Sequence, residues 1–414
     1  MPRLIDAPLQ RSLEAAGAVV VEGARATGKT MTGLHAANSY VFIDDIETQR
    51  ALEIAPRSIL EGQTPRLLDE WQVAPELWNL VRRAVDGSAK TGQFILTGSA
   101  VPPDDVTRHT GAGRFIRLRQ RTMTWWEKIG PSGNAVSLAQ LFQGARPTAD
   151  LGAGLELDQI IDNLLRPGFP AMTSLDLDQG AQRLVAYMDD VSRTDIQRLA
   201  DIRHEPSAIN HLIAALACST ATEVTYKTLA ADVQSVAPTI NQETISHYVQ
   251  LLQRLFIVEL QRPWTPQLRS RATVRTSPKL HLVDPALAAA AMRAGPAQLS
   301  RDLESLGFLF ESAVIHDLTA FAATLDGEVR HYRDSNGHEI DAIVTLPDGR
   351  WAAVEIKLGG RQATNAVESL DKSVRQIDTS VVGEPAFRLV VTGTGPLLTA
   401  DDDTVVCPLN ALAP

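Results

Sequence analysis

Gly23-Ala24-Arg25-Ala26-Thr27-Gly28-Lys29-Thr30 is the stretch of sequence that decides the fold. It matches the pattern G-x-x-x-x-G-K-[ST] of a phosphate-binding loop without a gap. The apolar run 18–21 comes just before it, and a helix-compatible run, 31–37, comes just after it. Because the pattern requires a strand, a loop and a helix in this order, we expect a nucleotide-binding domain in this part of the chain.

The residue types of this loop suit the binding of ATP and Mg²⁺. Glycines let successive backbone N–H groups turn toward phosphate oxygens, and the positive end of the following helix points at the same phosphates. We expect the lysine to reach the β- and γ-phosphates and the threonine hydroxyl to bind Mg²⁺. The predicted ATP-binding residues are Gly23, Arg25, Ala26, Thr27, Gly28, Lys29 and Thr30.

Four further apolar runs, at 40–43, 66–68, 93–96 and 114–118, alternate with helix-compatible stretches. Strands that alternate with helices favour a parallel sheet covered on both faces. The runs end in polar residues, as expected where ligands bind at the carboxyl ends of strands. The sequence therefore predicts an α/β fold, with the parallel sheet of a P-loop NTPase in residues 1–150.

Polar residues at two of these strand ends are candidates for hydrolysis. Asp69 and Glu70 fit a Walker B pair, in which the first acid helps Thr30 to hold Mg²⁺ and the second polarises the attacking water. Thr97 lies where a polar sensor would contact the γ-phosphate, with Ser99 as the alternative. The other interpretation of both hydroxyls is ordinary turn chemistry at a strand end.

Arginines cluster after the fourth apolar run. We predict that Arg114 stabilises transition-state charge as an arginine finger, so the predicted catalytic residues are Glu70, Thr97 and Arg114. The alternating Arg117 and Arg119 are expected to form one solvated strand face. An arginine finger acts within its own chain or across a subunit boundary, so the sequence leaves the oligomeric state open.

The segments 23–30, 67–72, 94–100 and 112–114 carry a resemblance that continues over nearly the whole chain. The chain resembles a large prokaryotic family of AAA-type ATP-binding proteins with a C-terminal domain of unknown function. The resemblance implies a P-loop ATPase core of the additional-strand class. Trp71 departs from the aliphatic residue usual in the family at that position. The physiological role of this family is largely uncharacterised, so the resemblance implies no pathway.

Residues 151–295 are predicted to be mostly helical, with a winged helix at about 222–262. Within it, a short helix, a break, a longer helix and a strand follow one another. In DNA-binding versions the second helix enters the major groove, which makes DNA a candidate partner. The alternative is a module that only packs. The candidate base-reading residues are Asn241, Gln242, Thr244, Ser246 and His247.

Basic residues follow this helix and are candidates for phosphate contacts from a wing. Their alternative interpretation is a solvated charged face. The stretch 277–285 matches a further part of the resembled family, and the sequence assigns no chemistry to it. The basic residues concerned are Arg262, Arg269, Arg271, Arg275 and Lys279.

Residues 296–414 are predicted to form an α/β domain with a nuclease-like fold. Asp341 followed by Glu355-x-Lys357, on two successive predicted strands, has the spacing of PD-(D/E)xK nucleases. In such sites the acids bind Mg²⁺ or Mn²⁺, and the metal and lysine together lower the pKa of an attacking water. Glu311, on the preceding predicted helix, is a further candidate acid.

The resembled family has a similar pattern in this region and is nuclease-like in fold. Fold alone does not imply cleavage. The alternative interpretation of Glu355 and Lys357 is a surface salt bridge beside a buried sheet. A second metal ion, Mg²⁺ or Mn²⁺, is therefore expected only if this site is a working nuclease.

The composition limits the classes of function. The 414 residues are 44% hydrophobic and carry a formal net charge of −10, which disfavours a protein that coats DNA. The two cysteines make neither a zinc site nor a disulfide framework. The sequence has no evident secretory signal and no apolar run judged long enough to cross a membrane, so we expect a cytoplasmic protein without a membrane partner.

The leading hypothesis is an ATP-binding, Mg²⁺-dependent ATPase whose nucleotide state controls a winged-helix and nuclease-like effector half. One rival is an ATP-regulated, metal-dependent DNA endonuclease of a defence or toxin-like system. Another is a nucleotide-dependent binding switch without nuclease activity. ATP is the expected ligand, and DNA and a protein are the candidate partners.

Overall fold

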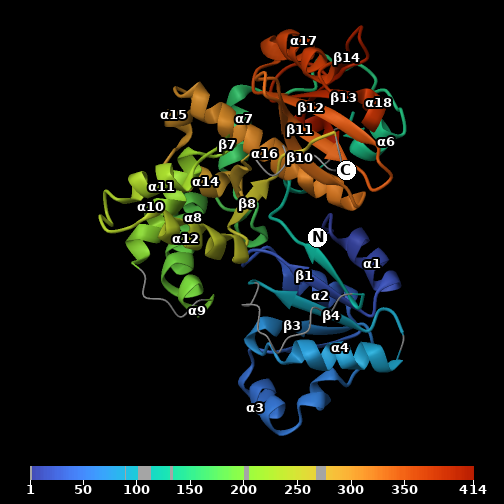
Figure 1. Ribbon diagram of the computed structural model, residues 1–414. Helices are drawn as coiled ribbons and strands as arrows, with labels where there is room; N and C mark the ends of the chain where they lie inside the picture. The colour runs from blue at the N-terminus through green and yellow to red at the C-terminus, as the bar shows by residue number, and fades with distance from the viewer. Residues whose placement is uncertain (1, 89, 101–112, 131–133, 200–204, 267–276) are drawn as a thin grey trace.

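The computed structural model describes residues 2–88, 90–100, 113–130, 134–199, 205–266 and 277–414. Figure 1 shows three regions: an N-terminal sheet at the bottom, a mainly helical region at the left and a C-terminal sheet at the top. The structure is therefore a mixed α/β fold that contains a parallel sheet, as the sequence predicts.

The N-terminal sheet has five parallel strands in the order β2-β3-β4-β1-β5. Each of its strands corresponds to one of the predicted apolar runs. The strand β4 is buried along its whole length and lies between β1 and β3, which is the strand order implied by the resemblance. The strands are β1 (Ala18–Glu22), β2 (Ser39–Phe42), β3 (Arg66–Asp69), β4 (Phe94–Gly98) and β5 (Phe115–Arg119).

Helices cover both faces of this sheet, because successive strand side chains point to opposite faces. Val19 and Val21 pack with residues of α1 on one face. Val20 packs with residues of α4 on the other face. The helices of this region are α1 (Asp6–Ala15), α2 (Lys29–Ala36), α3 (Ile46–Ile54) and α4 (Leu77–Ser88), with short 3-10 turns η1 (Pro56–Leu60) and η2 (Trp71–Val73).

The chain leaves the N-terminal sheet through α5 (Trp125–Ile129), β6 (Val136–Ser137) and α6 (Leu138–Phe142). The short strand β6 pairs with β16 (Leu412–Ala413), near the other end of the chain. This pairing brings Val136 and Ser137, within the predicted first domain of residues 1–150, next to the C-terminal region.

The middle region contains helices followed by a small antiparallel sheet in the order β7-β9-β8. The helices α11 and α12 confirm the two predicted helices of this segment: α11 has the predicted bounds, and α12 is shorter than the predicted helix 240–256. The elements are α7 (Leu157–Leu165), η3 (Pro170–Met172), α8 (Leu177–Asp190), η4 (Val191–Asp195), α9 (Ile196–Leu199), α10 (Pro206–Cys218), β7 (Thr222–Glu223), α11 (Tyr226–Val233), α12 (Gln242–Arg254), β8 (Val258–Gln261), β9 (Lys279–Leu282), α14 (Pro285–Ala291) and α15 (Pro296–Leu299).

The C-terminal sheet has six strands in the order β10-β11-β12-β13-β15-β14. The long helix α16 packs on one face and α17 on the other. The strands β10, β11 and β12 are antiparallel neighbours, whereas β12, β13 and β15 are parallel. The elements are α16 (Leu303–Thr324), β10 (Glu328–Arg333), β11 (Glu339–Thr345), β12 (Trp351–Lys357), η5 (Gly360–Gln362), α17 (Ala363–Val374), α18 (Thr379–Val382), β13 (Arg388–Thr392), β14 (Leu398–Thr399), β15 (Val405–Pro408) and η6 (Leu409–Ala411).

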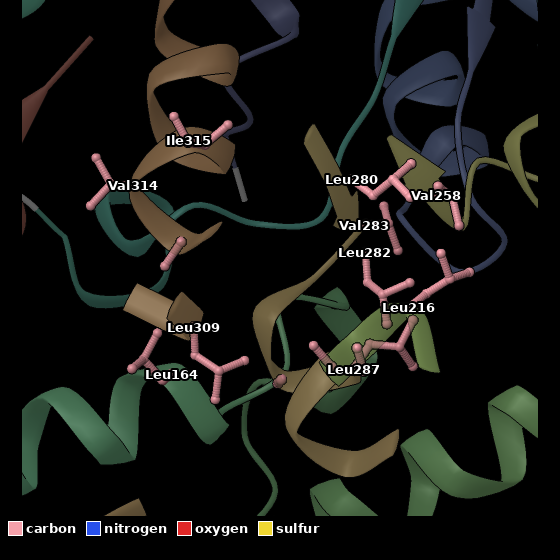
Figure 2. Packing of buried hydrophobic residues seen from close by; sticks show 14 of the residues in the cluster. Leu164, Leu216, Val258, Leu280, Leu282, Val283, Leu287, Leu309, Val314 and Ile315 are labelled. Carbon is pink, nitrogen blue, oxygen red and sulfur yellow. The ribbon is translucent and has the colours of Figure 1, made fainter. Parts of the chain in front are cut away.

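The middle and C-terminal regions share one apolar core. Figure 2 shows side chains from several elements gathered in it, among them Leu164 of α7, Leu216 of α10, Leu282 of β9 and Leu309 of α16. Each of these four side chains is at most 3% exposed. Because their burial is mutual, the two regions stabilise each other through the hydrophobic effect.

A second link joins the N-terminal sheet to the middle region. Glu259 of β8 forms ion pairs with Arg119 and Arg121, both at 3.1 Å. Burial would raise the pKa of Glu259, but the two guanidinium groups outweigh it and lower the pKa to about 2. Arg119 also stacks over the ring of Phe256, so the prediction of a solvated face for this arginine is wrong.

One helix of the described residues, α16, is long and apolar enough to cross a membrane by length and composition. This differs from the expectation that no apolar run is long enough. About 61% of its most apolar window is buried within the fold, as in the core helix of a protein without membrane spans. Its apolar residues instead pack against α14 and the C-terminal sheet.

Candidate functional site

The predicted phosphate loop connects β1 to α2, as the motif requires. Ala26 and Gly28 have φ values of 66° and 93°, so both adopt left-handed backbone conformations. Such turns aim successive N–H groups into one concave site, which is a ready anion cradle. A Cβ at Gly23 would lie 2.1 Å from the backbone oxygen of Gln120, so only glycine fits there.

The loop is supported from behind by two side chains that sequence reasoning missed. The carbonyl oxygen of Thr27 accepts hydrogen bonds from Arg3 at 2.8 Å and from Gln120 at 3.0 Å. Arg3 is itself held by an ion pair with the buried Glu127 at 2.8 Å. These bonds fix the back of the loop.

Lys29 is buried at the first position of α2. Its Nζ donates a hydrogen bond to the carbonyl oxygen of Ala24 at 2.8 Å, within the loop. Burial lowers the pKa of Lys29 to about 8, although Glu70 and Asp69 oppose that shift. The ammonium is therefore held inside the loop and is easier to deprotonate than an exposed lysine.

The carboxylate of Asp69 accepts hydrogen bonds from two hydroxyl groups, those of Thr30 and Thr97. Thr30 donates to its carboxylate with Oγ1 at 2.9 and 3.0 Å from the two carboxylate oxygens. Thr97 donates to the same carboxylate. The predicted Mg²⁺ ligands Thr30 and Asp69 are therefore in contact, and their oxygen atoms are the donor type that Mg²⁺ prefers.

Glu70 has a separate hydrogen-bond set. Its carboxylate accepts from Ser99 at 3.1 Å and from Gln72. The backbone φ of Glu70 is 56°, a left-handed conformation that is rare for a residue other than glycine. The two candidate sensor residues therefore bind different acids: Thr97 donates to Asp69, and Ser99 donates to Glu70. Gln72, which also contacts Ser99 at 3.2 Å, was not predicted.

Arg114 does not lie near the phosphate loop of its own chain. Its carbonyl oxygen accepts a bond from Ala18, at the start of β1, whereas the loop follows the end of that strand. A strand of this length spans about 15 Å. The guanidinium forms an ion pair with Asp86 at 2.7 Å. The structure therefore does not bring Arg114 together with Glu70 and Thr97 within one chain.

A cavity of about 950 Å³ opens in front of the loop. One wall carries Thr30, Asp69, Glu70 and Ser99 of the N-terminal region. The opposite wall comes from the middle region, at the end of α8, the π-helical turn η4 and α9. The residues on that wall include Tyr187, Val191, Asp195, Arg198 and Leu199.

Two contacts join the opposite wall to the loop. The hydroxyl of Tyr187 donates to the carbonyl oxygen of Arg25 at 3.3 Å. The guanidinium of Arg25 lies 3.6 Å from the carboxylate of Asp195. No local motif marks Tyr187, Asp195 or Arg198, because only the packing of a distant helix brings them to the cavity. Sequence reasoning could not find them for this reason.

The four predicted residues of the C-terminal site lie together at one end of the sheet. Lys357 forms ion pairs with Glu355 at 2.8 Å and with Asp341 at 3.8 Å. Glu311 reaches the same place from α16. Burial, with Asp341 as a second cause, raises the pKa of both Glu311 and Glu355 to about 7.

A fifth side chain enters this cluster from the middle region. Lys279, the first residue of β9, donates to Glu311 at 2.8 Å. It therefore does not project into solvent as a wing residue would. Among the described residues, no group of three or more histidine, cysteine, aspartate or glutamate side chains is arranged to hold a metal ion. In the observed arrangement the cluster does not fit a metal, because ammonium groups are bonded to Glu311 and Glu355.

The predicted base-reading residues lie at the start of α12. Asn241 caps this helix, since its side chain accepts a hydrogen bond from the backbone of Thr244 at 2.9 Å. That bond uses the oxygen that would otherwise face a base. Of the predicted wing arginines, Arg269, Arg271 and Arg275 lie outside the described residues.

The comparisons with known proteins match the chain in three consecutive parts. Residues 15–127 match an AAA domain. This match agrees with the expectation of a P-loop ATPase domain in the N-terminal part of the chain. Residues 157–298 match a domain of unknown function, DUF8612, and residues 306–412 match another, DUF4143.

Among solved structures, the chain is similar to a Walker-type ATPase of Pyrococcus abyssi, with a TM-score of 0.41 and 14% identity. The similarity covers 70% of this chain and 95% of that chain. No curated protein matches.

Proposed function

We propose that this protein is a Mg²⁺-dependent ATPase whose nucleotide state controls its middle and C-terminal regions. The observation that carries this proposal is the shared cavity of about 950 Å³. Thr30 and Glu70 line it from the N-terminal region, and Tyr187 and Arg198 line it from the middle region. A nucleotide bound to the loop would touch both regions. Loss of the γ-phosphate would then change the contacts of α8 and α9, as in other nucleotide switches.

Each residue near the loop has a role in this proposal. Lys29 and the loop N–H groups would hold the phosphates, and Thr30 with Asp69 would hold Mg²⁺. The ion supplies positive charge that offsets the negative charge of the reacting phosphate. Glu70 would orient and polarise the attacking water. Thr97, through Asp69, would position the metal ligand rather than contact the phosphate directly.

Replacement of Lys29 tests the nucleotide site. Lys29→Ala should abolish binding of a fluorescent ATP analogue and leave the fold intact, because the side chain contributes charge to the ligand rather than apolar contact to the core. Lys90→Ala, at an exposed lysine of the same domain, is the matched control. Unchanged affinity in a folded Lys29→Ala protein would remove the proposed site.

Hydrogen exchange tests the coupling. Backbone amides of α8 and α9 should exchange more slowly with a non-hydrolysable ATP analogue than with ADP, because the γ-phosphate would add contacts to the cavity wall that carries Arg198. Equal exchange in both nucleotides would leave an ATPase without the proposed control of the middle region.

A metal-dependent DNA endonuclease regulated by ATP is the second candidate. It is favoured by the placement of Glu311, Asp341, Glu355 and Lys357 at one sheet end. It is also favoured by the succession of α16, three antiparallel strands, α17 and the parallel strand β13, which we interpret as nuclease-like. Nicking of supercoiled plasmid in Mg²⁺ or Mn²⁺, with ATP, with ADP and without nucleotide, tests it. Asp341→Ala should abolish nicking and leave ATP hydrolysis intact.

A nucleotide-dependent binding switch without cleavage is the third candidate. Three helices, α10, α11 and α12, together with the sheet β7-β9-β8, have the order that we interpret as a winged helix. The ATPase rate with and without DNA separates this candidate from the others when no nicking is found. A rate that responds to DNA favours the switch, and an unchanged rate favours a module that only packs.

A further inference from the structure

The C-terminal cluster is built from two regions of the molecule, and the contribution of the middle region was not predicted. Lys279 lies at the start of β9, in the small sheet β7-β9-β8. Its ammonium reaches Glu311 of α16 at 2.8 Å, and the two side chains are only 14% and 15% exposed. A partly desolvated ion pair of this kind is expensive to break unless another charge replaces it.

A second contact fixes the same edge of the small sheet to the cluster. Gln261 pairs with Lys279 across β8 and β9. Its Nε2 donates to the carbonyl oxygen of Asp341 at 2.7 Å, and the residue is 4% exposed. Both members of one cross-strand pair therefore bind to acids, or the backbone of acids, of the C-terminal site.

The charges explain why the three acids do not form a metal site as they lie. Lys357 forms ion pairs with both Glu355 and Asp341, and Lys279 forms one with Glu311. The attraction of the surrounding acids raises the pKa of Lys279 in spite of its burial. Three carboxylates thus face two ammonium groups. A divalent cation that entered the cluster would find Glu311, one of its candidate ligands, already paired with Lys279.

We infer that Lys279 is a built-in counter-ion that keeps the C-terminal site closed to divalent cations while β9 rests against α16. A cation that binds Glu311 must displace the Lys279 ammonium. Movement of β9 away from α16 would favour cation binding, and cation binding would loosen β9. This inference rests on the proposed metal-dependent function of the C-terminal site.

The test is Mn²⁺ binding to the 414-residue protein without nucleotide. It is measured by isothermal titration calorimetry, or by the decrease of the electron paramagnetic resonance signal of free Mn²⁺. Lys279→Gln keeps a hydrogen-bond donor for Glu311 and removes the charge. It should bind Mn²⁺ about tenfold more tightly than the parent protein, since one positive charge next to the ligands is gone. Lys372→Gln, at an exposed lysine of α17, is the matched control and should leave Mn²⁺ affinity unchanged.

The possible results separate the inference from the function on which it rests. Equal Mn²⁺ affinity in the parent and Lys279→Gln would overturn the counter-ion role and leave the metal site standing, provided that Glu355→Gln weakens binding. Absence of Mn²⁺ binding in the parent, in Lys279→Gln and in Lys279→Met would overturn both. A cooperative thermal unfolding transition shows that each variant is folded. The double variant Lys279→Gln/Glu311→Gln can keep a hydrogen bond between the two side chains but carries neither charge. It should therefore lose the gain in Mn²⁺ affinity seen in Lys279→Gln.

Discussion

The hydroxyl of Tyr187 donates a hydrogen bond to the carbonyl oxygen of Arg25, 162 residues away in the sequence and inside the phosphate loop. Arg25 in turn faces Asp195, one helical segment beyond Tyr187. The loop that would hold the nucleotide is therefore in direct contact with the region that the nucleotide is proposed to control. Signal transfer between them needs no intermediate element.

Glu70 and Asp69 should fail in different ways when changed to their amides. Glu70→Gln should bind ATP with the affinity of the parent and hydrolyse it about a hundredfold more slowly or worse, because a positioned general base is lost. Asp69→Asn should weaken Mg²⁺-dependent binding itself, because its carboxylate holds Thr30. Binding titrations and single-turnover hydrolysis measure the two effects. Hydrolysis at the parent rate in Glu70→Gln would move the water-activating role to another acid, such as Asp44 or Asp45.

Arg198 and Arg114 form a matched pair of arginine substitutions. Arg198→Ala should slow ATP hydrolysis at least tenfold, because this guanidinium lines the cavity in front of Thr30 and Glu70. Arg114→Ala should leave the rate of the monomer unchanged, because its side chain pairs with Asp86 at the end of the strands opposite to the phosphate loop. The test is the rate of ATP hydrolysis of each variant, measured over a range of protein concentrations. A large loss in Arg114→Ala that depends on concentration would indicate a finger supplied to a neighbouring subunit.

The pH dependence of ATP binding should follow Lys29. Since burial lowers its pKa to about 8, the ligand-free protein loses this positive charge as the pH rises above 8. ATP affinity should therefore fall between about pH 8 and 10, measured by titration with a fluorescent analogue. Lys29→Met should bind weakly at every pH and show no such decline; a parallel decline in both proteins would assign the effect to another group.

The stability of the ligand-free protein should change with pH in the opposite direction. Between about pH 8 and the ordinary lysine value of 10.5, the unfolded chain keeps a proton on Lys29 that the folded chain has lost. This group alone therefore makes the folded state relatively more stable as the pH rises through that window. Urea unfolding of the parent and of Lys29→Met at both ends of the window measures the difference, which should be absent if Lys29 stays charged in the fold.

Asn241 should behave as a helix cap rather than as a reader of DNA bases. Asn241→Ala should lower the free energy of unfolding by about 1 kcal/mol, because it removes the bond to the backbone of Thr244. Gln242→Ala, one residue further on at an exposed position, should leave stability within experimental error. Chemical denaturation measures both. If Asn241→Ala instead changes DNA sequence preference without loss of stability, the capping role is secondary.

Local pattern was sufficient for the parts of the site that are contiguous in sequence. The phosphate loop, the strand that ends at Asp69 and the strand that carries Glu355 and Lys357 could be predicted because their periodicity and spacing are themselves the signal. Arg198 and Lys279 could not, because each reaches its site through the packing of elements far away along the chain. A role of Arg114 within its own chain could not be judged from the sequence either, since spacing along the chain does not say at which end of the sheet a side chain lies.

Glu259 gives the molecule a further property. Its single buried carboxylate serves Arg119 and Arg121 of the neighbouring sheet. A fragment that ends just beyond Arg121 would carry two guanidinium groups without their carboxylate partner, and a fragment that begins at the middle region would expose the Glu259 carboxylate without these two arginines. Expression of the regions as separate pieces is therefore a poor route to their biochemistry, and proteolysis should release them together rather than one by one.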